Sequence, residues 1–158
     1  MGIVDFFRPK ITEPRPEHME LAWAGEESAL GYLKVKESYR IVATNFRVPL
    51  GRGLSNRKIT GEIDIIAYDG PVLVFVEVKT RSSDEMVLPQ AAVDLRKQRQ
   101  IARTARRYRR MMSVLDEPYR YDVISIVRDS DQFRIELLKN YFNDSVFSRS
   151  SFFRREAY

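Results

Sequence analysis

The sequence contains no cysteine and only one histidine, His18, among its 158 residues. Without cysteine, the chain cannot form disulfides, zinc–thiolate sites or a thiol nucleophile. A single histidine excludes multi-histidine metal sites and leaves little basis for a Ser-His-Asp catalytic triad. Carboxylates and lysines are therefore the side chains from which we expect any chemistry to be built.

The sequence also lacks a long apolar segment. Its longest apolar run, Val72 to Val76, is far too short to span a bilayer. Charged residues and a proline interrupt the first ten residues, so they contain no secretory apolar region. We therefore expect a cytoplasmic protein that has no membrane partner.

Charge of one sign is only slightly in excess. The chain has 27 lysines and arginines against 22 acidic residues, which gives a net charge of +5. This surplus permits a polyanionic partner but is too small to establish one, so the placement of the charges matters more than their sum. The length suits one compact domain.

Patterning along the chain predicts an α/β domain with one mixed central sheet. An irregular leader over residues 1–20 precedes a domain at 21–146, and residues 147–158 form a tail rich in serine, arginine and aromatic residues. The element order is αβββαββ. We predict helices at 21–37 and 89–112, strands at 39–48, 62–68, 72–79, 121–127 and 133–138, and a loop at 49–60.

The predicted strand at 72–79 is apolar on both faces, which is typical of an internal strand. Its four valines at alternate positions, from Val72 to Val78, share one face, because side chains alternate along a strand. Glu77 and Lys79 lie on the other face with Leu73 and Phe75. Charges in an internal strand are costly to bury unless they are paired or bind an ion.

The preceding strand is expected to form a hairpin with this one through a two-residue turn at Asp69-Gly70. That turn places Asp64 opposite Phe75 and diagonal to Glu77, roughly 7–8 Å away. It also sets Glu62 opposite Glu77. Ile63, Ile65 and Ala67 then join the valine face.

Acidic groups that converge beside a lysine are a candidate site for Mg²⁺, which accepts one or two carboxylates and keeps water for exchange with phosphate oxygens. Such an ion can activate water and neutralise charge on a phosphate. The alternative is a structural Glu77–Lys79 salt bridge at a sheet edge. The hairpin alone favours that alternative slightly.

A third acidic residue, Glu26, falls inside the apolar arc of the helix predicted at 21–37, whereas Glu27 falls outside it. A glutamate on a buried stripe needs a partner, which an ion site under the helix would supply. The alternative is a helix that starts near Gly25, where Glu26 interacts favourably with the helix dipole. Asp64 and Glu77 nearby favour the ligand interpretation.

The helix predicted at 89–112 carries seven arginines and one lysine over residues 96–110, with no acidic residue. Six guanidinium groups on one face suit a phosphate backbone without sequence preference. Lys97, at the edge of the apolar stripe, could point toward the acidic groups. A solvated charged face is the alternative. The nucleic-acid-binding candidates are Arg52, Arg57 and Lys58 of the loop and Arg96, Arg99, Arg103, Arg106, Arg107 and Arg110 of the helix.

Two joined strings are distinctive: Gly61-Glu-Ile-Asp64-Ile-Ile-Ala67, and then Val74-Phe-Val-Glu77-Val-Lys79-Thr-Arg81. With Gly25-Glu26 and Asn45-Phe-Arg47, they resemble the bacterial YraN-like family of restriction-endonuclease-like proteins. That family is part of the PD-(D/E)xK nuclease superfamily and is similar to archaeal Holliday junction resolvases. The resemblance covers roughly residues 25–147.

The resemblance implies an αβββαβ core and a Mg²⁺ or Mn²⁺ cofactor. It implies that Asp64 and Glu77 bind the metal, that Lys79 is the catalytic lysine and that Glu26 is an auxiliary ligand. Glu62, Thr80 and Lys97 match accessory positions of the motifs. Resolvase-like enzymes act as dimers, so the resemblance also suggests a homodimer.

Three functions follow as hypotheses. The first is a metal-dependent endonuclease that hydrolyses DNA phosphodiesters, with branched or structured DNA favoured by analogy. The second is a non-catalytic nucleic-acid-binding module that keeps the fold. The third is an assembly factor whose basic helix docks an acidic protein. The complete acid, acid and lysine set favours the first.

Overall fold

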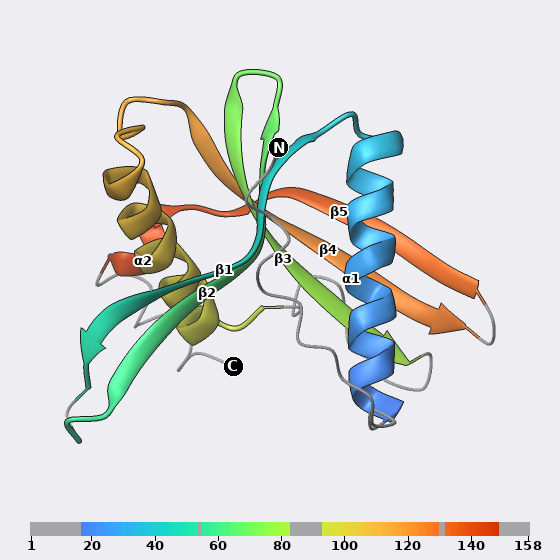
Figure 1. Ribbon diagram of the computed structural model, residues 1–158, viewed down its shortest axis with the longest axis horizontal. Helices are drawn as coiled ribbons and strands as arrows, with labels where there is room; N and C mark the ends of the chain where they lie inside the picture. The colour runs from blue at the N-terminus through green and yellow to red at the C-terminus, as the bar shows by residue number, and fades with distance from the viewer. Residues whose placement is uncertain (1–16, 54, 83–92, 130–131, 149–158) are drawn as a thin grey trace, which may run out of the picture.

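The computed structural model describes residues 17–53, 55–82, 93–129 and 132–148. Its elements follow the predicted order, with a short 3-10 helix at the end (Figure 1). They are α1 (Glu17–Val35), β1 (Arg40–Arg52), β2 (Lys58–Asp69), β3 (Val72–Ser82), α2 (Leu95–Met111), β4 (Tyr119–Asp129), β5 (Gln132–Phe142) and η3 (Asp144–Phe147). Within these ranges, no helix has the length and apolarity that crossing a bilayer requires.

The five strands form one mixed sheet in the order β1-β2-β3-β4-β5. Only β3 and β4 run parallel, and the other neighbouring pairs are antiparallel. The parallel pair is joined through α2, as a crossover connection requires. The predicted α/β fold with an αβββαβ core is confirmed, and β5 extends the sheet beyond that core.

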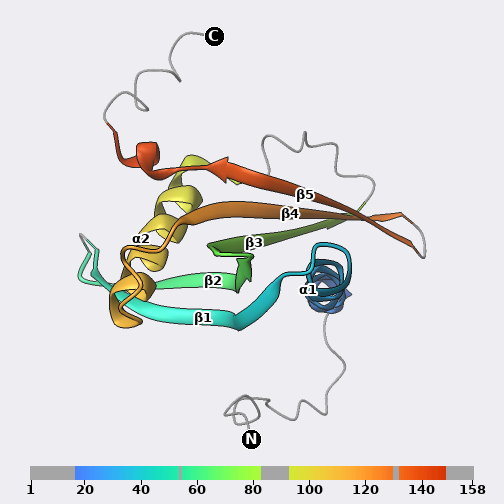
Figure 2. The same ribbon diagram turned by 90° about the horizontal axis from the view of Figure 1, so that it is seen from above.

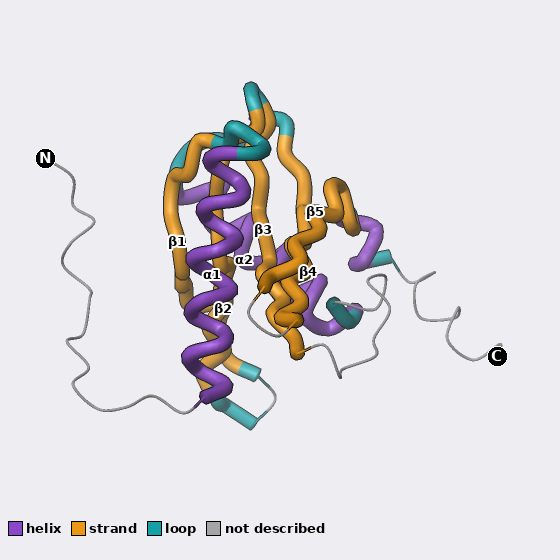
Figure 3. The backbone as a smooth tube through the Cα atoms, turned by 90° about the vertical axis from the view of Figure 1, so that its right-hand side faces the viewer, coloured by secondary structure: helices purple, strands orange, loops and turns teal. Residues whose placement is uncertain are grey.

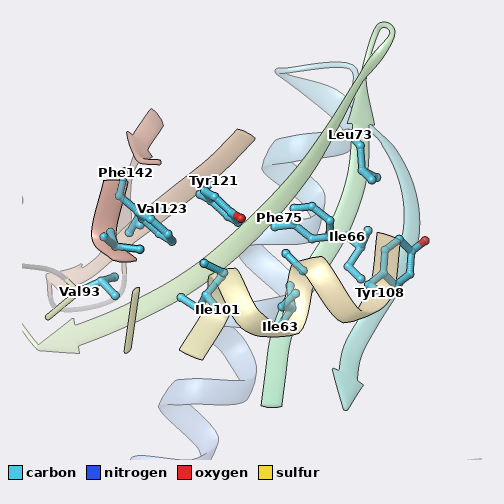
Figure 4. Close-up of a cluster of buried hydrophobic side chains, with 13 residues drawn as sticks. Ile63, Ile66, Leu73, Phe75, Val93, Ile101, Tyr108, Tyr121, Val123 and Phe142 are labelled. Carbon is cyan, nitrogen blue, oxygen red and sulfur yellow. The ribbon is translucent and has the colours of Figure 1, made fainter. Parts of the chain in front are cut away.

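The two helices cover opposite faces of the sheet: in Figure 3, α1 lies in front of the strands and α2 behind them. Figure 2 shows them at different ends of the twisted sheet. Ala29 and Leu33 of α1 pack on the valine face with Val74 and Val76. On the other face, α2 packs through Ile101, Ala102, Ala105 and Tyr108 onto a cluster that includes Phe75 and Tyr121 (Figure 4).

Central strand β3 is buried on both faces, as its sequence predicts. Leu73, Val74, Phe75 and Val76 are each 0% exposed. Burying a side chain of this size stabilises the fold by about 1.5–3 kcal/mol. The strand that carries Glu77 and Lys79 is therefore among the most firmly held parts of the molecule.

Several predicted boundaries are wrong. Residues 49–60 were expected to form a loop, but β1 continues to Arg52 and pairs with β2 down to Lys58, past a register shift between Pro49 and Gly51. An edge strand tolerates a proline because one side of its backbone has no partner.

The helix ends also differ from the predictions. Helix α1 already begins at Glu17, inside the expected leader. Helix α2 begins at Leu95 rather than Pro89, because the Asp94 side chain caps its first turn by accepting a hydrogen bond from the Lys97 N–H at 2.8 Å. Residues 89–92 and most of the expected tail lie outside the described residues.

Candidate functional site

The β2–β3 hairpin has a different register from the predicted one. Its turn is at Gly70-Pro71, so that Tyr68 pairs with Leu73 and not with Pro71. A shift of two residues leaves the faces unchanged but brings Asp64 level with Glu77, rather than diagonal to it. The prediction that Asp64 faces Phe75 is therefore wrong.

Strand β2 changes its course at Asp64. The β2–β3 pairs end at Ile65–Val76, and opposite Asp64 on β1 lies Asn45, whose φ of +51° is in the left-handed region. Asparagine enters this region at lower cost than most residues. The kink breaks the strict alternation of side chains, so Ile63 packs with the α2 cluster and not on the valine face where it was expected.

Asp64 lies just beyond the last β2–β3 pair, and its carboxylate accepts a hydrogen bond from the backbone of β3. Its Oδ2 accepts a hydrogen bond from the Val78 N–H at 2.7 Å. The pKa of this carboxyl is raised to about 7, first by burial and second by the charge of the neighbouring Glu77 carboxylate. The Val78 N–H and the Lys97 ammonium act in the opposite direction. The Glu77 carboxylate is therefore close enough to Asp64 for its charge to affect the Asp64 pKa.

Glu77 is more deeply buried than Asp64, with only 2% of its surface exposed. Its Oε1 binds two ammonium groups, Lys79 Nζ at 2.9 Å and Lys97 Nζ at 3.2 Å. Among the described residues, no hydrogen-bond donor reaches its other oxygen, Oε2, although that atom is buried. A buried carboxylate oxygen without a partner is costly, and a bound cation would satisfy it.

The two lysines stand between Glu77 and solvent. Their side chains are 34% and 28% exposed, against 2% for the carboxylate that they share. Lys79 follows Glu77 on the same face of β3, and Lys97 reaches it from the first turns of α2. The site thus presents two positive charges outward and keeps its negative charge inside.

The donor set fits a divalent cation held by two carboxylates, one from Asp64 and one from Glu77. Mg²⁺ and Mn²⁺ favour such oxygen ligands and complete their shell with water. In the described part of the chain, no group of three or more acidic or histidine side chains is close enough to form a ready cluster.

Glu26 lies half-buried on α1, beside the close contact between Gly25 and Thr80. Its charge adds slightly to the raised pKa of Asp64, so it faces the same region. Its role as an auxiliary ligand stays a prediction. Thr80 lies against α1, on the face of β3 opposite to Glu77, which gives it a packing position.

Glu62 does not face Glu77, as the predicted register required. Instead it pairs across the β1–β2 ladder with Arg47, whose Nη2 lies 2.8 Å from Oε1. The Arg47 side chain is 66% exposed, so this pair lies at the surface. Glu62 thus ties β2 to β1 two residues beyond Asn45.

Four of the seven arginines of α2 lie together. Arg103, Arg106, Arg107 and Arg110 line a hollow against Pro49, Leu50 and Gly51 of β1. Arg99 is turned away, because its Nε donates to the Val146 carbonyl at 2.7 Å. Arg96 is exposed, as are Arg57 and Lys58 at the β1–β2 turn, where Arg52 donates to the Asn56 carbonyl at 3.1 Å.

Sequence reasoning missed the structural role of Asp122, which is 1% exposed on β4. Its carboxylate accepts hydrogen bonds from Arg120 Nε at 2.9 Å, Asn140 N at 2.8 Å and the Tyr39 hydroxyl at 3.2 Å. An aspartate in an otherwise apolar strand signals such a network. Asn45, a poor strand former inside a strand, was the corresponding signal for the kink at Asp64.

The model of the uncharacterised protein family UPF0102 matches residues 25–126, which include every candidate metal ligand. The chain is similar to a UPF0102 protein of Koribacter versatilis, at 36% identity over 89% of this chain and 90% of that protein. It is also similar to one of Geotalea uraniireducens, at 41% identity over 83% and 95% of the two chains.

A search of solved structures finds the crystal structure of SSO0001, at 16% identity and a TM-score of 0.43 over 80% of this chain and 54% of that one. The family match over residues 25–126 and the two relatives show that the chain belongs to the UPF0102 family, the YraN-like family that its paired motifs resemble.

Proposed function

We propose that the protein is a metal-dependent endonuclease that hydrolyses phosphodiester bonds of DNA. The observation that carries the proposal is the buried and unpartnered Oε2 of Glu77 beside the Asp64 carboxylate. Metal-dependent phosphodiester hydrolysis needs acidic ligands for the ion and a cation near the reacting phosphate. Asp64 and Glu77 supply the acids, and Lys79 and Lys97 supply partly exposed cations.

Each residue has a separate task in this proposal. Asp64 and the Oε2 of Glu77 hold a Mg²⁺ or Mn²⁺ ion, which when bound supplies Lewis acidity and lowers the pKa of coordinated water. Glu77 Oε1 stays committed to Lys79 and Lys97. One carboxylate thus links the metal side of the site to its cationic side.

Lys79 is the residue that we assign to the reacting groups. Its Nζ is held at 2.9 Å from Glu77 Oε1 on the rigid central strand, yet a third of the side chain is exposed. A fixed ammonium at the rim can orient an attacking water and stabilise charge that develops on the phosphate. Lys97 adds a second cation from α2.

The arginines of α2 support a polyanionic substrate, since they lie on the same side of the sheet as Glu77. The preference for DNA, and for branched or structured DNA, rests on the resemblance to resolvases. One observation favours a second candidate, a nucleic-acid-binding module without catalysis: two lysines already neutralise Glu77, as in a structural ion pair.

A cleavage screen tests the proposal. Purified protein is incubated with linear, flapped, forked and four-way DNA in Mg²⁺, in Mn²⁺ and in EDTA. We expect metal-dependent cleavage of at least one substrate, reduced at least about 100-fold in Glu77→Gln and Lys79→Ala. Glu136→Gln, an exposed acid of β5, is the matched control and should cleave like wild type.

The opposing outcomes are distinct. Equal cleavage by wild type and both site variants would assign the activity to a contaminant and refute the site. No cleavage under any condition, together with DNA binding that persists in Glu77→Gln, would establish the binding module instead.

A further inference from the structure

A hollow of about 380 Å³ lies between α2 and the β1 edge of the sheet. Its walls are residues 49–51 of β1 and four arginines spaced along α2: Arg103, Arg106, Arg107 and Arg110. At the lower left of Figure 1, α2 crosses the long β1–β2 hairpin, and the residues that line the hollow come from α2 and β1. Because β1 continues through Pro49, its residues 49–51 lie opposite the arginines of α2 and form the second wall of the hollow.

The charge of the hollow is all of one sign. All four arginines are exposed, and no acid is among the residues that line the hollow. Like charges at i,i+4, such as Arg103 with Arg107 and Arg106 with Arg110, destabilise a helix. Because the four arginines repel one another along one wall of the hollow, a ligand with several negative charges is favoured there. Arginine is the residue best suited to phosphate groups there.

The hollow lies further along the helix that carries Lys97, a residue of the candidate catalytic site. Lys97, which contacts Glu77, lies on the same helix as the four arginines. At 1.5 Å per residue, the arginines are about 9–20 Å along the axis from Lys97. That span corresponds to about three to six stacked nucleotides at 3.4 Å per nucleotide. This axial separation is within the length of a short single strand.

The dimensions and the surroundings favour a single strand over a duplex. The hollow is at the small end of ligand pockets of about 300–1,000 Å³, so it can take in one sugar–phosphate backbone but not the cross-section of a double helix. At its margin, Arg106 lies 5.7 Å from the ring centroid of Phe147, which is 38% exposed. An exposed aromatic ring beside a basic groove offers a base a surface to stack on.

We infer that the hollow between α2 and β1 is a backbone-binding subsite for a single nucleic-acid strand, three to six nucleotides from the position that Glu77 and Lys79 act upon. The inference takes its class of ligand from the proposed function but requires no cleavage. It adds a substrate requirement: a dinucleotide is too short to reach the hollow, whereas a strand of ten or more nucleotides engages it.

Binding in EDTA tests this subsite apart from catalysis. Fluorescence anisotropy measures the affinity of a labelled single-stranded 12-mer and of its duplex over a range of salt concentrations. We expect Arg107→Glu to weaken single-strand binding on the order of tenfold and to make the salt dependence shallower by about 0.7 or more in logarithmic slope. Phe147→Ala should weaken the single strand and leave the duplex unchanged.

Arg134→Glu is the matched control, because it makes the same charge change at an exposed position of β5, on the opposite edge of the sheet. Equal losses in Arg107→Glu and Arg134→Glu would overturn the inference, since net charge alone would then explain binding. Tighter binding of the duplex, with the same dependence on Arg107, would also overturn it. So would displacement of the 12-mer by an acidic peptide of equal charge.

Discussion

At the scale of single residues, the two oxygens of Glu77 have different surroundings. Oε1 binds two lysines, whereas Oε2 is buried without a donor among the described residues. The burial of Glu77 follows from its sequence, because it lies in an internal strand. Its contact with Lys97 depends on how far α2 is rotated about its own axis. The sequence pattern only places Lys97 at the border of the apolar stripe.

Asp64 makes the stability of the metal-free protein depend on pH. Its folded-state pKa is raised from 3.8 to about 7, so the folded state keeps a proton that the unfolded state loses. The stabilising effect of this carboxyl is complete below pH 3.8 and is lost as the pH rises to about 7. Asp64→Asn removes the dependence, since the amide does not ionise.

Urea unfolding in EDTA, measured from pH 4.5 to 8, checks this expectation. The free energy of unfolding of wild type should fall relative to that of Asp64→Asn up to about pH 7 and then run parallel to it. The exposed Glu136→Gln serves as the control and should track wild type. A wild-type stability that rises relative to Asp64→Asn over this range would show that Asp64 is stabilised as the anion.

At the scale of the elements, two glycines set how closely the helices approach the sheet. A Cβ at Gly25 of α1 would lie 2.0 Å from Thr80 Oγ1 of β3. A Cβ at Gly61 of β2 would lie 2.1 Å from Thr104 Oγ1 of α2. Both glycines stand next to candidate site residues, so these close approaches position α1 and α2 around the site.

Two glycines of α1 give a matched test of this idea. Gly31→Ala should stabilise the protein by about 0.5–1 kcal/mol, because a Cβ there meets nothing within 4 Å and alanine favours helix. Gly25→Ala gains the same propensity but collides with Thr80, so we expect a net loss of about 1–3 kcal/mol. Thermal and urea unfolding of both variants measures the difference. Equal effects would mean that α1 does not depend on this contact.

The prediction of the elements succeeded where one periodicity dominated. The apolar stripe expected on the arginine-rich helix is present in α2, where Ile101, Ala102, Ala105 and Tyr108 are buried. Strand β1 was cut short at Val48, because Pro49 and the glycines that follow are turn signals, and only tertiary pairing with β2 overrides them. The hairpin register failed because Asp69-Gly70 and Gly70-Pro71 are both acceptable turns, and side-chain alternation cannot distinguish a shift of two residues.

At the scale of the whole molecule, charges are sorted along the sheet. The ends of β1 and α2 present arginines, Asp64 and Glu77 lie on the central strands, and Asp122 of β4, which pairs with Val76 of β3, anchors a buried network. In that network, Arg120 lies between Asp122 and Asp69, at 2.9 and 2.6 Å respectively. The modest net charge of the chain conceals this arrangement, which arises only when distant segments fold together.

The central claim is that Asp64 and Glu77 form a divalent cation site. Titration of the metal-free protein with Mn²⁺, followed by calorimetry, tests it without requiring the substrate. We predict one bound ion per chain at pH 8, weakened at least about 100-fold in Glu77→Gln and unchanged in Glu136→Gln. The same stoichiometry and affinity in wild type and Glu77→Gln would contradict the account.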